Sequence, residues 1–288
     1  MLKTITYSVP LAGLPGDFLP FRIVHLSDLH GRIFGKHNSI LMDAVRSLSP
    51  DLIVMTGDMA EPGRGKSDKD GRQAFLKLCR SLVSLCPVYY SLGNHESEMP
   101  SDHLTSWLKK VRRTGVLALD NQRADFIHDG VVFPVFGLTI PLLYYKDPLR
   151  KPYDRHACWT AQDTEKVFGS VPKNGAENFG PSILLAHNPL YFPAYRDWGA
   201  DLTLAGHIHG GIIRLPFLGG VLSPDLTLFP KYDGGHFSEG SLGLTGSQKK
   251  HMIVSRGLSN TFLKRVLNPM ELVCTVISPD MANSSDIK

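Results

Sequence analysis

Short apolar runs alternate with amphipathic segments along the first half of the chain. The runs Phe21–Leu26, Leu52–Met55 and Val88–Leu92 predict buried β-strands, because they are short and rich in β-branched or aromatic side chains. Between them, Asn38–Leu48 and Gln73–Leu85 carry apolar residues at helical spacing. Strands separated by helices of this length predict a parallel α/β sheet.

The pattern changes to consecutive strands after a third predicted helix, Ser101–Arg113. The sequence His128-Asp129-Gly130 separates two of these strands and is typical of a hairpin turn. Later apolar runs predict strands that are buried on both faces. The strands predicted in this part are Val116–Leu119, Arg123–Ile127, Val131–Leu138, Ser182–Ala186, Leu202–Ala205, His251–Arg256 and Glu271–Ile277.

Two segments lack a regular pattern. Ala60–Gly71 is rich in glycine and charge and is predicted to be a loop. Pro141–Gly180 is rich in proline, tyrosine and charge, with one helix predicted at Thr160–Phe168. It forms either a lid over a substrate or a packed surface segment. The chain shows no internal repeat and no linker composition, so we predict one domain over residues 1–288 with its core at about 21–277.

Composition narrows the class of protein. The chain has 288 residues, 42% hydrophobic and 20% charged, which is ordinary for a globular enzyme. The net charge of +4 is too small to indicate nucleic-acid binding, and no window approaches the roughly 18 apolar residues of a membrane span. Met1–Pro20 lacks the apolar core of a signal peptide, and the four cysteines form no Cys-x-x-Cys pair. We therefore expect a cytoplasmic protein, with peripheral membrane contact as the alternative.

The residues that could bind a ligand or catalyse a reaction lie where the predicted core strands end. Asp58 follows Leu52–Met55 after Thr56 and a glycine, which puts a carboxylate at the edge of the sheet where α/β proteins bind ligands. Because a buried, unpaired carboxylate is costly, Asp58 predicts a cation or a hydrogen-bond network beside it. Other strands end in similar polar groups. The full set is Asp28, His30, Asp58, Asn94, His95, His187, His207 and His209.

These side chains predict metal binding. Mixed Asp, Asn and His ligands without cysteine suit Mn²⁺, Fe, Co²⁺ or Zn²⁺. The spacing of Asp28 and His30, and of His207 and His209, lets alternate side chains of an extended segment point the same way. This number of ligands is larger than one metal ion with an open coordination position requires. It suits two metal ions. Two ions about 3.5–4 Å apart, joined by a carboxylate, would turn a bridging water into a hydroxide nucleophile for phosphoryl transfer.

Five blocks of the sequence resemble those of calcineurin-like metallophosphoesterases and occur in the order of that family. The resemblance covers about Phe21–Ile277. The sequences Arg214-Leu215-Pro216 and Val254-Ser255-Arg256-Gly257 look like the bacterial YkuE/YaeI-type phosphodiesterase branch. The resemblance implies a four-layer α/β/β/α sandwich of two mixed β-sheets. The blocks are Asp28-Leu29-His30, Gly57-Asp58, Gly93-Asn94-His95-Glu96, His187 and Gly206-His207-Ile208-His209.

The resemblance also implies roles for individual residues around two metal ions, which would be Mn²⁺, Fe, Zn²⁺ or Co²⁺. His95 would contact the substrate phosphate and protonate the leaving oxygen as a general acid. Glu96 would orient His95, and Asp58 would bridge both ions. The remaining ligands would be Asp28, His30 and His209 for one ion, and Asn94, His187 and His207 for the other.

Taken singly, these residues also have ordinary structural roles. Asp28 and Asp58 could cap helices that follow their strands, and His187 could be a structural histidine. Their joint occurrence at five strand ends favours the metal site. Arg214 and Arg256 either bind the substrate phosphate or are structural arginines, and the structural role is favoured.

The apolar run Leu215–Leu218, with Val221-Leu222 and Leu228-Phe229 behind it, lies just beyond the last ligand block. It either receives an acyl chain or a membrane surface, or folds back onto the second sheet, and folding back is favoured. The predicted activity is hydrolysis of phosphodiesters or phosphomonoesters. The alternatives are a lipid-linked or nucleotide-sugar pyrophosphate hydrolase and a non-catalytic binding scaffold on the same fold. The expected partner is a small phosphoester or a lipid-linked substrate, and not a nucleic acid.

Overall fold

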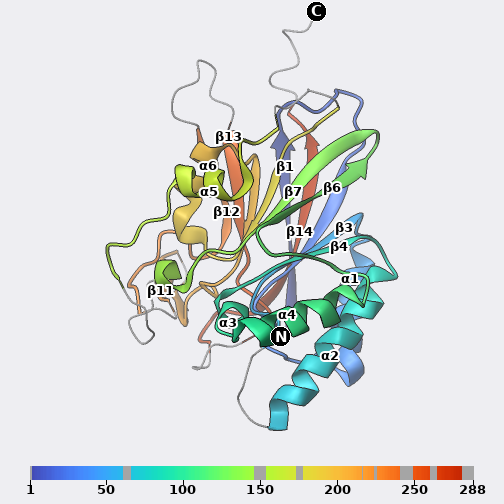
Figure 1. The fold of residues 1–288 in the computed structure, drawn as a ribbon, viewed down its shortest axis with the longest axis vertical. Coiled ribbons are helices and arrows are strands. Elements are labelled where there is room, and N and C mark those ends of the chain that lie inside the picture. The colour runs from blue at the N-terminus through green and yellow to red at the C-terminus, as the bar shows by residue number, and fades with distance from the viewer. Residues whose placement is uncertain are drawn as a thin grey trace, which may run out of the picture.

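Two six-stranded sheets pack face to face, and helices cover the outer face of each sheet (Figure 1). The predicted four-layer α/β/β/α sandwich is therefore confirmed. Among the described residues, no helix is long and apolar enough to cross a bilayer. The computed structural model describes residues 2–60, 66–145, 154–172, 178–215, 217–223, 226–240, 249–259 and 265–280, without the side chains of 66–70.

The first sheet contains the parallel strands that the apolar runs predict. Strands β2, β3, β4 and β5 lie side by side and run parallel. At least one helix connects each of these strands with the next, as parallel pairing requires. Strand β14 pairs antiparallel with β2 and parallel with β1. The strands in spatial order are β1 (Leu2–Leu11), β14 (Met270–Pro279), β2 (Phe21–Leu26), β3 (Leu52–Thr56), β4 (Val88–Ser91) and β5 (Leu117–Leu119).

The second sheet has four parallel strands at its centre and an antiparallel strand at each edge. The predicted hairpin is confirmed: Asp129 and Gly130 turn the chain with positive φ angles of 50° and 74°. The strands in spatial order are β12 (Gly235–Gly240), β13 (Lys249–Val254), β9 (Leu202–Ala205), β8 (Ile183–Ala186), β7 (Val131–Leu138) and β6 (Gln122–His128).

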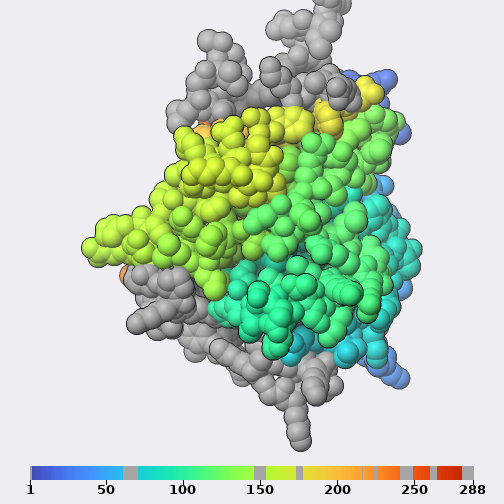
Figure 2. Space-filling model, in the orientation of Figure 1, coloured from blue at the N-terminus to red at the C-terminus, as the bar shows by residue number. Residues whose placement is uncertain are grey.

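The helices lie in two groups on opposite sides of the sheets (Figure 1). In the space-filling view, the middle of the chain, in green and yellow-green, covers the face toward the viewer (Figure 2). The helices over the first sheet are α1 (Ser39–Ser47), α2 (Lys66–Val83) and α4 (Ser101–Arg112), and those over the second are α5 (Ala161–Phe168) and α6 (Phe192–Trp198). Shorter elements are α3 (Asn94–Ser97), η1 (Lys36–Asn38), η2 (Leu142–Tyr145), η3 (Pro189–Tyr191) and the hairpin β10 (Ile213–Leu215) and β11 (Gly219–Leu222).

The layered core explains why the strand sequences are apolar without alternation. In β3, Ile53 and Met55 pack against the helices, whereas Leu52 and Val54 pack against the second sheet. Successive side chains point to opposite faces of a strand, so a strand buried on both faces must be apolar throughout. All four side chains are fully buried.

Some sequence predictions are wrong at the margins. Helix α2 begins at Lys66, inside the predicted loop Ala60–Gly71. The N-terminal strand β1 extends the fold beyond the predicted core, and edge strand β12 was missed, because both expose alternate polar residues and lack an apolar run. Of the segment Pro141–Gly180, residues 146–153 and 173–177 lie outside the described residues, so its role as a lid stays a prediction.

The loops that follow β3 and β4 touch each other through two glycines. Gly57 has a φ of +84°, and a Cβ added there would overlap the backbone of Gly93. A Cβ added to Gly93 would in turn overlap Asp58. Only glycine permits this approach, and the approach brings Asp58 next to the residues that follow Gly93.

Gly57→Ala tests this close contact. We expect a loss of about 3 kcal/mol in the free energy of unfolding, since the alanine adds a left-handed backbone penalty to a steric overlap. Urea denaturation followed by circular dichroism measures the loss. Gly130→Ala is the matched control: it has a φ of +74° but open space within 4 Å, so about 1 kcal/mol is expected. Equal losses in the two variants would contradict the role of the contact.

Candidate functional site

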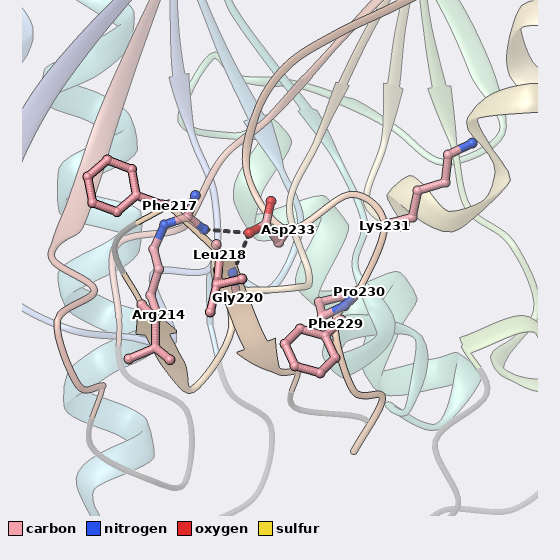
Figure 3. A pocket seen from close by; sticks show the side chains of 10 residues that line it. Arg214, Phe217, Leu218, Gly220, Phe229, Pro230, Lys231 and Asp233 are labelled. Carbon is pink, nitrogen blue, oxygen red and sulfur yellow. Dashed lines mark hydrogen bonds and ion pairs between the residues drawn. The ribbon is translucent and has the colours of Figure 1, made fainter.

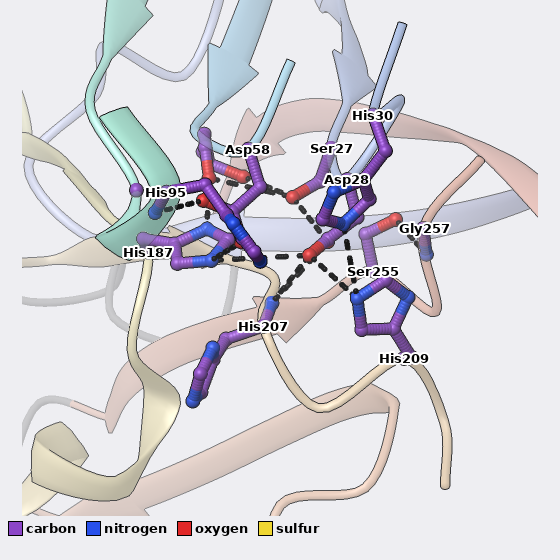
Figure 4. Close-up of polar contacts among 12 residues, drawn as sticks. Ser27, Asp28, His30, Asp58, His95, His187, His207, His209, Ser255 and Gly257 are labelled. Atoms are coloured by element: carbon purple, nitrogen blue, oxygen red, sulfur yellow. Dashed lines mark hydrogen bonds and ion pairs between the residues drawn. The ribbon is translucent and has the colours of Figure 1, made fainter. Parts of the chain in front are cut away.

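Strands from both sheets deliver the predicted ligands to one edge of the sandwich (Figure 4). Asp28 and His30 follow β2, and Asp58 follows β3, both in the first sheet. In the second sheet, His187 follows β8, and the pair at positions 207 and 209 follows β9. The carboxyl ends of these parallel strands meet because the two sheets pack face to face.

Five of the predicted ligands have a left-handed backbone conformation, which is uncommon outside glycine. Each such residue costs about 1–3 kcal/mol, and the conformation persists only where the surrounding structure enforces it. Strain of this kind concentrates at functional sites. Other described residues outside the clusters, such as Ser49 and Asn121, share the conformation, so the backbone supports the site only together with the side chains. The φ angles are 53° at Asp28, 47° at His30, 52° at Asp58, 70° at His207 and 55° at His209.

One cluster contains Asp28, His30 and His209, whose candidate ligand atoms all lie within 4.8 Å of one another. His209 Nε2 lies 3.2 Å from Asp28 Oδ1 and 3.4 Å from His30 Nε2. Asp28 is fully buried at the centre of Figure 4, where Ser27 Oγ donates to it at 2.6 Å. These are the three residues predicted for one ion.

A second cluster contains Asp58, His187 and His207, again within 4.8 Å of one another. His187 Nδ1 donates to the carbonyl of Thr56 at 2.5 Å, which directs its Nε2 at Asp58 Oδ2, 3.1 Å away. Asp58 also groups with His30 and His95 within the same limit. The carboxylate of Asp58 therefore lies between the two clusters.

Asn94 begins α3 and is buried, and its side-chain Oδ1 has no hydrogen-bond partner among the described residues. His187 Nε2 likewise lacks a partner in hydrogen-bond geometry. Buried acceptors are rarely left unpartnered, because desolvation without a compensating contact is costly. Two unpartnered ligand atoms beside two buried carboxylates fit hard or borderline cations of the kind that Asp, Asn and His bind.

The pKa shifts of the residues in the clusters also indicate a site for cations. Burial raises the pKa of Asp28, and the negative charge of Asp58 adds to the rise. Burial also acts to raise the pKa of Asp58, but the neighbouring His187 and His95 outweigh it and hold that pKa well below its usual range. Conversely, burial acts to lower the pKa of His187, but Asp58 raises it to about 9. Two buried carboxylates thus compete for positive charge at this edge.

Glu96 holds the loop that carries Asp58. Its buried carboxylate accepts backbone N–H groups from Asp58 at 2.8 Å, Met59 at 2.8 Å and Gly93 at 2.9 Å. A fourth donor, the N–H of Ala60, lies 3.3 Å away. The predicted role of Glu96 in orienting His95 stays a prediction, and the observed contacts assign it to the joint between the β3 and β4 loops.

His95 lies at the outer rim of the clusters. Its backbone N–H donates to Asp58 Oδ1 at 2.9 Å, and its imidazole packs edge-on against His30 with ring centroids 5.0 Å apart. The side chain is 19% exposed, and its Nδ1 lies 3.8 Å from a carboxylate oxygen of Glu98. An imidazole in this position reaches both the clusters and the solvent.

The two arginines proposed for substrate binding are both paired with carboxylates. Arg214 Nη1 lies 2.8 Å from Asp233 Oδ2 (Figure 3), and Arg256 Nε lies 2.5 Å from the fully buried Glu271. These ion pairs favour the structural role for each. Their contact with a substrate phosphate stays a prediction.

Two residues near the clusters were not predicted from the sequence. Arg265 donates from Nη2 to His209 Nδ1 at 2.9 Å, and Tyr145 packs against His207 with ring centroids 5.0 Å apart. Burial lowers the pKa of Arg265 to about 10, which leaves the guanidinium charged at neutral pH. Nothing in the sequence distinguishes Arg265 from its neighbour Lys264, and Tyr145 belongs to a segment without a regular pattern.

The apolar run after the last ligand block does not fold back onto the second sheet, and that prediction is wrong. It forms the β10–β11 hairpin, where Phe217 is fully exposed and Leu218 is 66% exposed. A cavity of about 460 Å³ lies between the hairpin and Pro230 (Figure 3). Most of the exposed large apolar side chains in the described part of the chain lie here: Ile213, Leu215, Phe217, Leu218, Leu226, Leu228, Phe229, Val266 and Leu267.

Comparisons with known proteins agree with this geometry. The model of the family "Calcineurin-like phosphoesterase" matches residues 21–211. The chain is 27% identical to metallophosphoesterase YkuE of Bacillus subtilis, covering 91% of this chain and 80% of that protein. It is 25% identical to phosphodiesterase YaeI of Escherichia coli, covering 88% and 80%. It is 26% identical to UDP-2,3-diacylglucosamine pyrophosphatase LpxG of Chlamydia trachomatis, covering 87% and 82%.

The fold also occurs in a distant solved structure. Haemophilus influenzae NAD nucleotidase (NadN) superimposes with a TM-score of 0.52 at 12% identity, over 83% of this chain and 45% of that chain. This likeness concerns the fold alone. The match to the family model spans all five strand-end blocks up to residue 211. The chain therefore belongs to the calcineurin-like phosphoesterase family, whose members hydrolyse phosphoester bonds.

Proposed function

We propose that the protein is a dinuclear-metal phosphohydrolase that cleaves phosphodiesters or phosphomonoesters. The observation that supports the proposal is the pair of ligand clusters on either side of Asp58. When bound, two cations would supply positive charge to the phosphoryl oxygens and acidify the attacking water. The ions suited to the donors are Mn²⁺, Fe, Zn²⁺ and Co²⁺.

The proposed roles follow the two clusters. Asp58 is the bridging ligand, because it groups with His187 and His207 of one cluster and also with His30 of the other. The left-handed turns described above direct the ligands inward from strands of both sheets. The ligands proposed for one ion are Asp28, His30 and His209, and those for the other are Asn94, His187 and His207.

His95 is proposed as the general acid. Its backbone N–H is fixed on Asp58 at 2.9 Å, while its side chain is partly exposed at the rim, where a leaving group would depart. From this position its imidazole can hand a proton to the leaving oxygen while the ligands behind it remain in place. His95 is thus assigned to proton transfer and not to metal binding.

Asp58→Asn tests the bridging role. The amide keeps the size of the side chain but removes its charge, so we expect metal content below that of the parent protein. We expect hydrolysis of bis-p-nitrophenyl phosphate to fall at least about 100-fold, since even outer partners of metal ligands contribute about 10–100-fold. Elemental analysis and initial rates are measured on one sample.

Asp43→Asn is the matched control, because Asp43 is an exposed carboxylate on α1. It should retain both metal content and rate. An Asp58→Asn protein with full turnover and full metal content would refute the bridging role.

His95→Ala separates chemistry from metal binding. We expect unchanged metal content and a fall in kcat of about 10²–10⁴, the range for general acid catalysis. The loss should shrink with a substrate whose leaving group needs no proton, such as a p-nitrophenyl ester, compared with an alkyl ester. A variant with parental kcat on both esters would remove His95 from the mechanism.

A second candidate is a hydrolase of lipid-linked or nucleotide-sugar pyrophosphates. The exposed apolar hairpin favours it, because β10 begins four residues after His209 and presents Phe217 and Leu218 to solvent. The relative LpxG bears the name of such a pyrophosphatase. A non-catalytic scaffold is not favoured, because every ligand that the family resemblance predicts is present.

The double variant Phe217→Ser/Leu218→Ser tests the second candidate. With a diacylated nucleotide-sugar pyrophosphate in mixed micelles, we expect hydrolysis to fall at least about 10-fold, since burying each apolar side chain contributes about 1.5–3 kcal/mol. Hydrolysis of the soluble bis-p-nitrophenyl phosphate should not change. Ile127→Ser, an apolar residue 67% exposed on edge strand β6, is the control. Equal losses with both substrates would argue against lipid recognition by the hairpin.

A further inference from the structure

Arg265 places a positive charge beside the first ligand cluster. Its Nη2 donates to His209 Nδ1 at 2.9 Å and also to the carbonyl of Ser259, and its Nη1 donates to the carbonyl of Gly257 at 3.4 Å. Its Nε is buried and has no partner among the described residues. The guanidinium is therefore held by backbone carbonyls and one imidazole.

The partners of Arg265 differ in kind from those of the other arginines near the site. Arg214 and Arg256 are each paired with a carboxylate, whereas within the described ranges no carboxylate lies in hydrogen-bond distance of Arg265. Asp28 and Glu271 stabilise its charge electrostatically, but from beyond hydrogen-bond distance. Mostly buried charges are normally paired directly, because desolvation is costly. Arg265 thus has unused capacity to bind an anion, through a fork suited to phosphate.

The contact with His209 is compatible with only one form of that imidazole. Arginine always donates, so His209 Nδ1 must be bare and its proton must sit on Nε2, which faces Asp28 Oδ1 at 3.2 Å. A cation bound through Nε2 requires the other tautomer, with the proton on Nδ1. Two N–H groups would then face each other, and Arg265 would lose this acceptor.

We propose that Arg265 binds the phosphoryl group of the substrate, and that metal loading of His209 frees its guanidinium to do so. The inference rests on the proposed function, because the phosphoryl group must sit at the ligand clusters. A phosphate supplies a directly bonded negative charge and can accept two N–H groups of the guanidinium at once. Arg265 is then the substrate-binding arginine, in place of the carboxylate-paired Arg214 and Arg256.

Calorimetric titration of the metal-loaded protein with inorganic phosphate tests the proposal. We expect Arg265→Gln to keep the parental metal content and to weaken phosphate binding about 10- to 100-fold, the loss expected for a charge-assisted pair. The phosphate affinity of Arg265→Lys should lie between those of the parent and of Arg265→Gln, since lysine keeps the charge but not the forked guanidinium. The KM for bis-p-nitrophenyl phosphate should rise in the same order.

Arg123→Gln is the matched control, because Arg123 is an arginine of edge strand β6 that is paired with Asp125. It should bind phosphate like the parent. Added guanidinium chloride at millimolar concentration should partly restore phosphate binding to Arg265→Ala and leave the control unchanged, which a merely structural role would not produce.

Two results would overturn the proposal. One is Arg265→Gln with full metal content and parental phosphate affinity, and the other is loss of metal in that variant, which would make Arg265 a positioning residue for His209. Phosphate binding is measured without turnover. A parent protein that binds metal and phosphate but hydrolyses no ester would therefore refute the proposed function and still decide the role of Arg265.

Discussion

The carboxylate of Glu96 is the interaction on which the geometry of the site depends. It is fully buried and accepts backbone N–H groups from both the β3 loop and the β4 loop, so it replaces water for donors that neither loop could satisfy alone. Gly57 and Gly93 let the two backbones approach closely enough for one carboxylate to reach both. Together with the hydrogen bond from the His95 N–H to Asp58 Oδ1, this joint fixes Asp58 relative to Asn94.

The sandwich architecture supplies what one sheet could not. A single parallel sheet brings Asp28 and Asp58 to its carboxyl edge, but these carboxylates would repel each other there. The second sheet adds His187 and His209 from the opposite side of the same edge, and their nitrogens lie within 3.1–3.2 Å of the two carboxylates. The left-handed turns that aim these side chains cost free energy, which the packed strands on both sides sustain.

Arg265 and the β10–β11 hairpin lie next to each other beside the clusters, because Val266 pairs with Ile213 of β10. Within the described part of the chain, Arg265 has no carboxylate in hydrogen-bond distance, and Asp28 and Glu271 stabilise its charge only from farther away. The hairpin presents Phe217 and Leu218 to solvent directly after the last ligand block. A phosphate with an apolar substituent matches both features, whereas a small polar ester would use the first alone. Under the proposed function, the residues around the metal ligands, more than the ligands themselves, would therefore set the choice of substrate.

The sequence by itself determined the core strands, their two-sided burial and the candidate ligand set, because these follow from local periodicity and residue type. The buried run Leu52–Met55 and the polar group after it are readable without any partner. Only the tertiary structure decided which arginine lies beside the clusters, since Arg265 and His209 are 56 residues apart. It also decided that Glu96 clamps backbone and that the apolar run near Phe217 stays exposed. Hydrogen-bond partners and exposure depend on distant segments meeting in space, which no local pattern encodes.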